Sequence, residues 1–487
     1  MQNYRNIIVV SLALLLLLAC NISSLSTTTV TKSAPTGVGE LQTSAPSPSP
    51  TPLTPTVTAA PAGLNGNGPF ILFKGQDGIW ITNPDGSFPT RVSEFGIQGD
   101  LRPAISPAGD RMALVVENDQ GLDLVMVQIP SGAIETIDHL ISVTTADLSA
   151  NPTTPKAFAT YAIRDNPDVA WQPGAGRYLA FTGAIDGPTS DLYVYDTQTH
   201  ATKQLTSGPS QAITPIWSPD GQYILSFGVS WVPPFGGAIL PDRLDGIWAV
   251  RVSDGKIIPL PSPKNTSQSI SPNFVGWQDA SHYISYDTDD QCASINLHTV
   301  DVASGETKSL MATSFYDYIA RSPENGGLLF SSAAGCPSSL GDGTFLLLPG
   351  QTTPVKVLDK QTWEIDWLPE SKVFYAYPEA LVSSDGNTRY DPPVYSASYL
   401  PAVSKAGYQA WEVLQNQQGS VAVRIPGGDW QTILKGSVTQ LIWDPAEGKT
   451  LLISLQDGSL YAASYPLFTP RLMGSVGSKI DQAIWVP

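Results

Sequence analysis

Short apolar runs separated by turn residues recur along most of this 487-residue chain. Five stretches share one form: an apolar run with Trp or an aliphatic residue, a Pro, a short polar turn, and a second apolar run. They are residues 103–114 (PAISPAGDRMAL), 169–181 (VAWQPGAGRYLAF), 215–227 (PIWSPDGQYILSF), 365–375 (IDWLPESKVFY) and 441–452 (LIWDPAEGKTLL). Proline ends a strand because it lacks an N–H, and Asp-Gly favours a turn. Each stretch therefore predicts a hairpin whose second strand is buried.

Two weaker strands follow several of these hairpins. Residues 191–196 precede 201–206, residues 245–251 precede 256–260, and residues 295–301 precede 306–310. Apolar and polar residues alternate in these segments, as expected of half-buried strands. Four antiparallel strands per repeat are typical of a propeller blade, so the pattern predicts an all-β fold, a β-propeller.

The residue that follows each first strand gives the number of repeats. It falls at nine positions: Pro107, Pro173, Pro219, Asp279, Pro323, Pro369, Lys405, Pro445 and Pro487. Blades usually span about 40–50 residues. Longer spacings indicate insertions at residues 141–165 and 228–244. Residues 370–404 show no clear pair of outer strands, so we merge the repeats at Pro369 and Lys405 into one irregular blade. Eight blades result, with seven as the next alternative.

The two ends of the repeat region complement each other. The chain ends at residues 484–487 with a first strand alone, whereas residues 69–73, 77–82 and 90–92 form a blade that lacks its first strand. We expect the C-terminal strand to complete the N-terminal blade, which would remove a free sheet edge. An open array of β-sandwiches is the alternative.

These hairpins resemble a known repeat. The Ser-Pro-Asp-Gly turn, followed by Leu-Tyr-Val-Tyr-Asp and Lys-Gln-Leu-Thr segments, is similar to the WD40-like (PD40) repeat of the TolB family. The resemblance extends from about residue 69 to the end of the chain and is closest at residues 215–227. It implies a propeller fold. It implies little about function, because the repeat occurs in periplasmic TolB, in peptidase propellers and in many surface proteins.

The N-terminal region predicts export and lipid anchoring. Residues 1–19 contain Arg5 and then an apolar run at 7–18, too short to span a bilayer and typical of a signal peptide. The segment ending in Cys20 resembles the bacterial lipobox, which implies acylation of Cys20 and attachment to a lipid bilayer. An ordinary signal peptide is the alternative. Residues 20–68 are rich in Pro, Ser and Thr, so we expect a disordered tether between the anchor and a propeller at 69–487.

The remaining cysteines, Cys292 and Cys336, each follow the second strand of adjacent blades. Their loops should lie on one face of the fold, and export permits oxidation. We therefore expect a disulfide between them, with two isolated buried thiols as the alternative.

The net charge of the chain limits the kinds of partner that it is expected to bind. The formal net charge is −17, which argues against binding to nucleic acid. Solubility alone would account for the same acidity, and divalent cations or basic ligands remain compatible with it.

No motif for catalysis or for a cofactor is evident. The histidines His139, His200, His282 and His298 are spread over different loops and strands without metal-ligand spacing. No Gly-x-Ser-x-Gly elbow is present. We expect no catalytic, cofactor or metal residues.

Aromatic residues in the insertions are the better candidates for contact with a ligand. Trp231 and Phe235 lie in one insertion, and Tyr390 and Tyr395 lie in the irregular blade. Exposed aromatic clusters in loops favour binding to a protein or a glycan. These loops could equally cap their own blades.

The resulting expectation is a bacterial lipoprotein, at the cell surface or facing the periplasm, that acts as a non-catalytic binding or scaffold module. One alternative is a lyase or glycoside hydrolase with its site in the propeller funnel. A second, by resemblance alone, is a subunit of a TolB-like envelope complex.

Overall fold

The computed structural model divides the chain into two compact units, Met1–Leu53 and Thr54–Pro487. All described residues belong to the second unit. They are 63–66, 68–95, 100–143, 155–165, 169–231, 241–262, 273–289, 293–332, 340–362, 364–377, 379–393, 400–415, 418–476 and 479–487. The signal peptide, Cys20, Phe235, Cys292, Cys336 and Tyr395 therefore lie outside the described residues, as does most of the tether.

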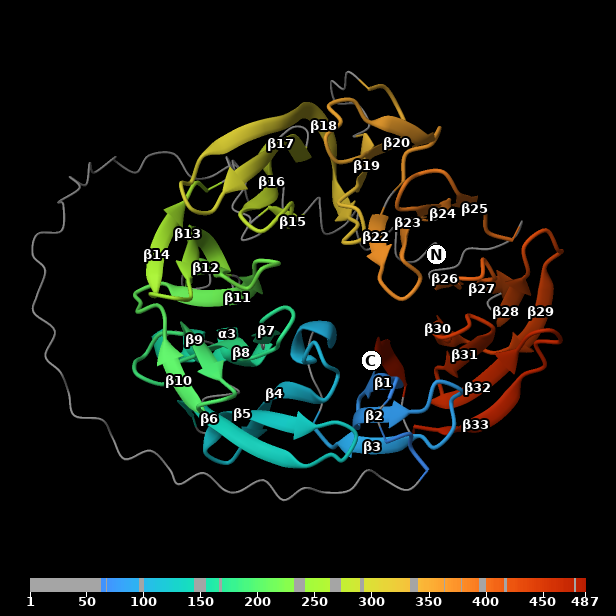
Figure 1. The fold of residues 1–487 in the computed structure, drawn as a ribbon, viewed down its shortest axis with the longest axis horizontal. Coiled ribbons are helices and arrows are strands. Elements are labelled where there is room, and N and C mark those ends of the chain that lie inside the picture. Colours follow the sequence, from blue (N-terminus) through green and yellow to red (C-terminus); the bar gives the residue numbers. More distant parts are fainter. Residues whose placement is uncertain are drawn as a thin grey trace, which may run out of the picture. The chain divides into compact units, whose positions relative to one another are not determined.

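The fold is all-β and consists mainly of four-stranded antiparallel sheets, the organisation of a β-propeller (Figure 1). The N-terminal half contributes four sheets. The first sheet has the order β3 (Thr90–Ser93), β2 (Gly78–Thr82), β1 (Phe70–Gly75) and β34 (Ile480–Val486). The second has β4 (Arg111–Asn118), β5 (Gly121–Gln128) and β6 (Ile134–Ser142), preceded by the short helix η1 (Arg102–Ala104). The third has β7 (Val169–Trp171), β8 (Tyr178–Gly183), β9 (Asp191–Asp196) and β10 (Ala201–Gln204). The fourth has β11 (Gln211–Trp217), β12 (Tyr223–Trp231), β13 (Pro241–Arg251) and β14 (Lys256–Leu260).

A seven-stranded sheet follows, and three four-stranded sheets come after it. The seven strands are β15 (Phe274–Trp277), β16 (His282–Asp289), β17 (Ala293–Asp301), β18 (Thr307–Arg321), β19 (Leu328–Ser332), β20 (Thr344–Leu347) and β21 (Val355–Leu358). The next sheet has β22 (Glu364–Leu368), β23 (Val373–Tyr377), β24 (Ala380–Ser383) and β25 (Arg389–Tyr390). The last two are β26 (Pro401–Val403), β27 (Gln409–Gln415), β28 (Gln418–Arg424) and β29 (Gln431–Lys435), and then β30 (Val438–Trp443), β31 (Thr450–Leu455), β32 (Ser459–Ser464) and β33 (Arg471–Ser475).

The predicted hairpins form as the turn chemistry requires. In the clearest copy, the Ser218 hydroxyl donates to the Asp220 carboxylate at 2.6 Å, and the Gly221 amide donates to the Ser218 carbonyl at 2.8 Å. Gly221 has φ +68°, a left-handed value that glycine adopts without strain. The Ser218 amide then donates to the Tyr223 carbonyl, which closes the hairpin.

The merging of the repeats at Pro369 and Lys405 was wrong. Pro369 follows β22 and Lys405 follows β26, and these two strands begin separate four-stranded sheets. The outer strands between them are short, because β24 has four residues and β25 has two. An alternating pattern needs more positions than that to be recognised.

The nine repeats do not give nine sheets. The described residues form eight separate sheets, because strand β18 belongs to two repeats. It is 15 residues long. Its first part pairs with β17 and its last part pairs with β19. It therefore serves as the outermost strand of one four-stranded half and as the first strand of the next.

The C-terminal strand β34 pairs antiparallel with β1, the strand that lacked a neighbour in the sequence. Phe70 lies opposite Val486 and Leu72 lies opposite Ile484. The two ends of the repeat region thus belong to one hydrogen-bonded sheet.

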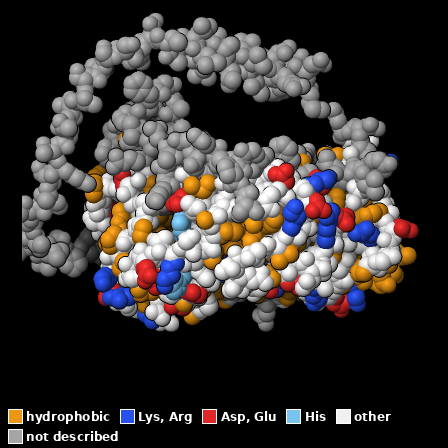
Figure 2. All heavy atoms as spheres, turned by 90° about the horizontal axis from the view of Figure 1, so that it is seen from above, with side chains coloured by type: hydrophobic (Ala, Val, Ile, Leu, Met, Phe, Trp, Pro, Cys, Tyr) orange, Lys and Arg blue, Asp and Glu red, His pale blue; other side chains and the backbone are white. Residues whose placement is uncertain are grey.

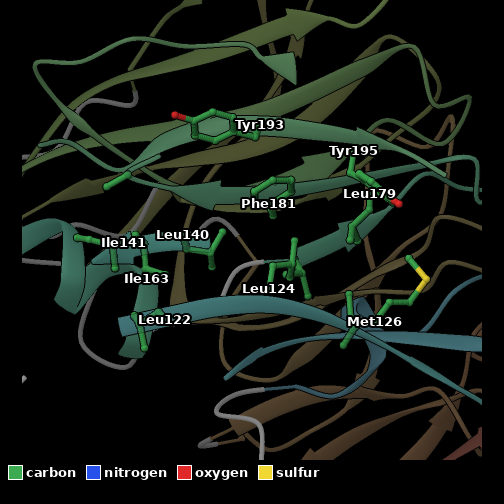
Figure 3. Packing of buried hydrophobic residues seen from close by; sticks show 14 of the residues in the cluster. Leu122, Leu124, Met126, Leu140, Ile141, Ile163, Leu179, Phe181, Tyr193 and Tyr195 are labelled. Atoms are coloured by element: carbon green, nitrogen blue, oxygen red, sulfur yellow. The ribbon is translucent and has the colours of Figure 1, made fainter. Parts of the chain in front are cut away.

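Among the described residues, nine buried apolar clusters each join two successive sheets, or the two halves of the seven-stranded sheet. Figure 3 shows the cluster in which Leu124 of β5 and Leu140 of β6 pack with Phe181 of β8 and Tyr193 of β9. The last cluster joins Ile442 of β30 to Ile71 of β1. The core is therefore distributed between sheets and has no single centre.

In several hairpins, a tryptophan at the end of the first strand forms a hydrogen bond to the preceding sheet. The indole Nε1 of Trp171 donates to the Ala104 carbonyl at 2.8 Å, and that of Trp217 donates to the Ala170 carbonyl at 2.8 Å. Trp443 donates to the Ala402 carbonyl at 3.3 Å in the same way. In each case one residue of the preceding sheet occupies the position that corresponds to the tryptophan. The accepting carbonyl belongs to the residue just before it. These three tryptophans therefore combine apolar burial with a hydrogen bond across the interface, whereas the indole nitrogens of Trp277, Trp367 and Trp485 have no hydrogen-bond partner in the described part of the chain.

The structured region begins a few residues earlier than the sequence indicates. Leu64, placed in the tether by composition, is buried in the cluster that contains Phe70. The Asn83 side chain also donates to the Gly63 carbonyl at 3.0 Å. One insertion contains the helix α3 (Pro155–Asp165), and the other extends the β12–β13 hairpin.

Candidate functional site

Charged residues from two distant segments meet polar groups of the C-terminal strand. We call β22 and β34, which each lie at one end of the strand order of their sheets, inner strands. Arg102 of η1 lies 3.2 Å from the Asp100 carboxylate and 3.1 Å from the Glu370 carboxylate. Glu370 belongs to the turn between β22 and β23 (Figure 1). Its second oxygen accepts the Trp485 amide of β34 at 3.3 Å. We call Asp100, Arg102, Glu370 and Gln482 the inner cluster.

Gln482 completes the inner cluster from β34. Its side-chain oxygen accepts the Leu101 amide at 2.8 Å, and its side-chain nitrogen donates to Asp100. The hydrogen bonds therefore tie the β22–β23 turn, η1 and the C-terminal strand together. They link sheets that are not neighbours along the chain.

The environment of Glu370 differs from that of Asp100. The side chain of Glu370 is 19% exposed, whereas that of Asp100 is 48% exposed. Burial raises the pKa of Glu370, and the attraction of Arg102 opposes this rise. The inner cluster thus contains one carboxyl group that holds its proton more readily than usual, and one that faces solvent beside a cation.

Asp366 of β22 is a further carboxylate near this region. Desolvation raises its pKa, as does the neighbouring Glu364, and Arg102 opposes the rise. Its side chain is nevertheless exposed. Together with Asp100 and Arg102 it offers solvent-facing charge at the inner strands, suitable for contact with a polar ligand.

Trp231 and Tyr390, the two aromatic candidates among the described residues, lie in different surroundings. Trp231 ends β12, opposite Pro241 of β13, and so lies in a hairpin extension. Tyr390 of β25 is half-buried and packs against the cluster that contains Tyr375 and Trp411. Contact of Trp231 or Tyr390 with a ligand stays a prediction.

Each described histidine lies near a carboxylate. His298 lies 3.0 Å from Asp287, and His282 lies 3.0 Å from Asp279. Within the described residues, no group of three or more His, Cys, Asp or Glu side chains is arranged to hold a metal ion.

Asp123, His139 and Ser142 are hydrogen-bonded in series on β5 and β6. His139 Nδ1 lies 2.6 Å from Asp123, and its Nε2 lies 2.9 Å from the Ser142 hydroxyl. A serine hydrolase uses this order of groups. Asp123, however, also accepts the Asn118 side chain at 2.6 Å, and Ser142 is exposed at the end of the edge strand. We interpret the series as a surface network that fixes the register of the two strands.

The sequence did not predict the inner cluster. Arg102 and Glu370 are 268 positions apart, so no local spacing connects them. Glu370 stands in the turn of a repeat, where a polar residue is expected for the turn alone. The only local signal is a glutamate where other copies have Asp, Gly or Ala.

Both charge signs occur on the surface. On the face in Figure 2, acidic and basic side chains are interspersed with uncharged ones. Among the described helices, none combines the length and apolar character needed to cross a membrane.

Comparisons with known proteins give partial similarities. No family model matches the chain. An uncharacterized peptidase, YuxL of Bacillus subtilis, is 36% identical over 66 residues, which are 14% of this chain and 10% of that protein. The chain therefore spans only a small part of this curated relative.

Solved structures match over longer stretches at low identity. Dipeptidyl peptidase 4 of Porphyromonas gingivalis is 11% identical with a TM-score of 0.45, over 78% of this chain and 62% of that one. Oligogalacturonate lyase of Vibrio parahaemolyticus is 12% identical with a TM-score of 0.34, over 63% and 78%. TolB of Acinetobacter baumannii is 11% identical with a TM-score of 0.27, over 77% and 82%. These values assign the chain to no family.

Proposed function

We propose that this protein is an extracytoplasmic, lipid-anchored β-propeller that binds a protein or an envelope glycan through its inner strands, without chemistry on the ligand. The convergence of Asp100, Arg102 and Asp366 supports this proposal. Asp100 and Arg102 lie in one segment before β4, and Asp366 belongs to β22 of another sheet and interacts electrostatically with Arg102. Asp100 and Asp366 are both exposed. Rigid inner strands hold such groups in a fixed arrangement, which lowers the entropic cost of recognition.

We propose further that the propeller is closed and has nine blades. The two halves of the seven-stranded sheet then count as two blades that share β18. The nine interface clusters, which run in order from the first sheet back to β1 and β34, support this count. This replaces the eight blades expected from the sequence.

Binding is tested with the full chain. Native membranes and a glycan array are probed with the wild type, with Asp100→Asn and with Asp254→Asn. Asp254 is a matched control because it pairs with Arg251 on an outer hairpin and is 49% exposed, against 48% for Asp100. Capture that Asp100→Asn weakens and Asp254→Asn leaves intact supports the proposal. No ligand from either source, or equal effects of both substitutions, contradicts it.

Anchoring is tested separately at Cys20. Replacement by Ser should move the protein from the membrane fraction to the soluble fraction. The Cys292–Cys336 disulfide belongs to the same proposal of export. Alkylation of the denatured, unreduced protein should find no free thiol at these two positions, and two free thiols would end that part of the account.

An enzyme with its site at the inner strands is the second candidate. The raised pKa of Glu370 favours it, because a carboxyl group that keeps its proton can act as a general acid. Turnover of acidic or neutral polysaccharides by the wild type, lost in Glu370→Gln without loss of folding, would support an enzyme over a binding module.

A further inference from the structure

Six of the nine copies of the hairpin have a tryptophan at the end of the first strand, and the other three have Ile105, Val403 and Arg321. Arg321 is the charged residue among them. Arg321 lies at the end of β18 and pairs with Leu328, as Trp171 of β7 pairs with Leu179. The amide of the next residue closes the hairpin in both cases, Ser322 to Gly327 and Gln172 to Tyr178. Arg321 therefore stands where six other copies place a tryptophan.

The arginine does not reproduce the tryptophan's hydrogen bond. Its Nη2 donates to the Gln278 carbonyl at 3.4 Å, which is long for a hydrogen bond. Its Nε is buried and has no hydrogen-bond partner. Among the described residues, no carboxylate lies within ion-pair distance of Arg321. Burial lowers the pKa of the Arg321 guanidinium, but the group stays charged at neutral pH.

A cavity of about 290 Å³ lies beside this cation, between the two halves of the seven-stranded sheet. Its apolar lining residues come from β16, β18, β19, β20 and the turn after β20. They are Ile284, Leu310, Leu328, Leu347 and Leu348. Glu324 also lines the cavity, but its carboxylate lies 3.1 Å from the Lys372 ammonium.

The chemistry of the cavity selects its ligand. A guanidinium without an acidic partner binds a carboxylate through two parallel hydrogen bonds. Gln278, Asn325 and Gln351 also line the cavity. The leucines and Ile284 favour a short hydrocarbon body, and the volume is at the small end of ligand sites. We propose that this cavity binds a small carboxylate with an aliphatic tail, with the carboxylate on Arg321 and the tail against the leucines. This site is separate from the inner cluster and goes beyond the proposed function.

Calorimetric titration of the full chain tests the site with butanoate, hexanoate and octanoate at constant ionic strength. The wild type should bind hexanoate more tightly than butanoate. Arg321→Met should weaken hexanoate binding roughly 10- to 100-fold, the range expected when hydrogen bonds to a charged group are lost. Arg321→Lys should bind more weakly than the wild type but more tightly than Arg321→Met.

Controls separate the site from general effects. Arg251→Gln removes a comparable arginine on an outer hairpin and should leave hexanoate binding unchanged. Arg321→Trp introduces the residue that six other copies of the hairpin have at this position, and it should remain folded by circular dichroism while losing the ligand. Absence of alkanoate binding, equal binding of hexan-1-ol or phosphate, or unchanged binding in Arg321→Met would overturn the proposal. None of these outcomes bears on capture through Asp100.

Discussion

Trp171 and Arg321 occupy the same place in their hairpins and produce different interfaces. Trp171 fills the space between two sheets and donates to the Ala104 carbonyl at 2.8 Å. Arg321 leaves a cavity of about 290 Å³ and a guanidinium without an acidic partner among the described residues. The difference shows that the residue at this position decides whether the interface is filled, and we infer that the charged Arg321 meets a requirement other than stability.

The largest expected effect comes from removing β34, because its residues belong to two interface clusters. Deleting residues 479–487 exposes the edge of β1 and removes Ile480, Ala483, Ile484 and Val486 from two clusters. We expect loss of cooperative unfolding, measured by circular dichroism on heating. Deletion of the exposed Pro487 alone is the control and should leave a cooperative transition. A cooperative transition in the longer deletion would contradict closure of the ring.

The next largest effect distinguishes the interface at Trp171 from the interface at Arg321. Trp171→Ala should lower the free energy of unfolding by about 3–5 kcal/mol, because a buried aromatic side chain is lost and leaves a cavity. Arg321→Ala should cost less than about 1 kcal/mol, because the space beside it is already empty. Chemical denaturation measures both. Equal costs would show that the two interfaces are packed alike.

A smaller effect is expected in the inner cluster. Arg102→Met leaves the Glu370 carboxylate without its cation, which should cost roughly 1–3 kcal/mol of unfolding free energy. Adding Glu370→Gln should restore part of this loss, since the amide carries no charge. Denaturant titrations of the two single variants and the double variant give the coupling. Strictly additive effects would show that the pair contributes nothing to stability.

The smallest effect is a pH dependence at Glu370. Burial raises the pKa of Glu370 in the folded state above its ordinary value of 4.5, so the folded state binds this proton more tightly than the unfolded state. The stabilisation from this group is complete below the unfolded pKa and is lost as pH rises through the folded pKa. Glu370→Gln should therefore gain stability relative to the wild type as pH rises from 4 to 7. A relative loss over that range would mean that Arg102 dominates over burial.

The sequence was informative about the repeat and uninformative about the sites. Period-two patterns and Pro-Asp-Gly turns are local, so the hairpins and the pairing of β34 with β1 could be predicted. Strand β25, with two residues, and strand β18, shared by two halves of one sheet, are not visible in a local pattern. The meeting of Arg102 with Glu370 depends on tertiary structure, as does the cavity beside Arg321.

The most direct test of the account is the free energy of unfolding of Arg321→Trp compared with that of the wild type, both without ligand. If Arg321 marks a binding site within a repeat that has tryptophan at this position in six copies, the substitution should stabilise the protein, since the indole fills the cavity beside Leu328 and Leu347. A substitution that destabilises the protein as much as Trp171→Ala would show that the interface was built for arginine, and would contradict the account.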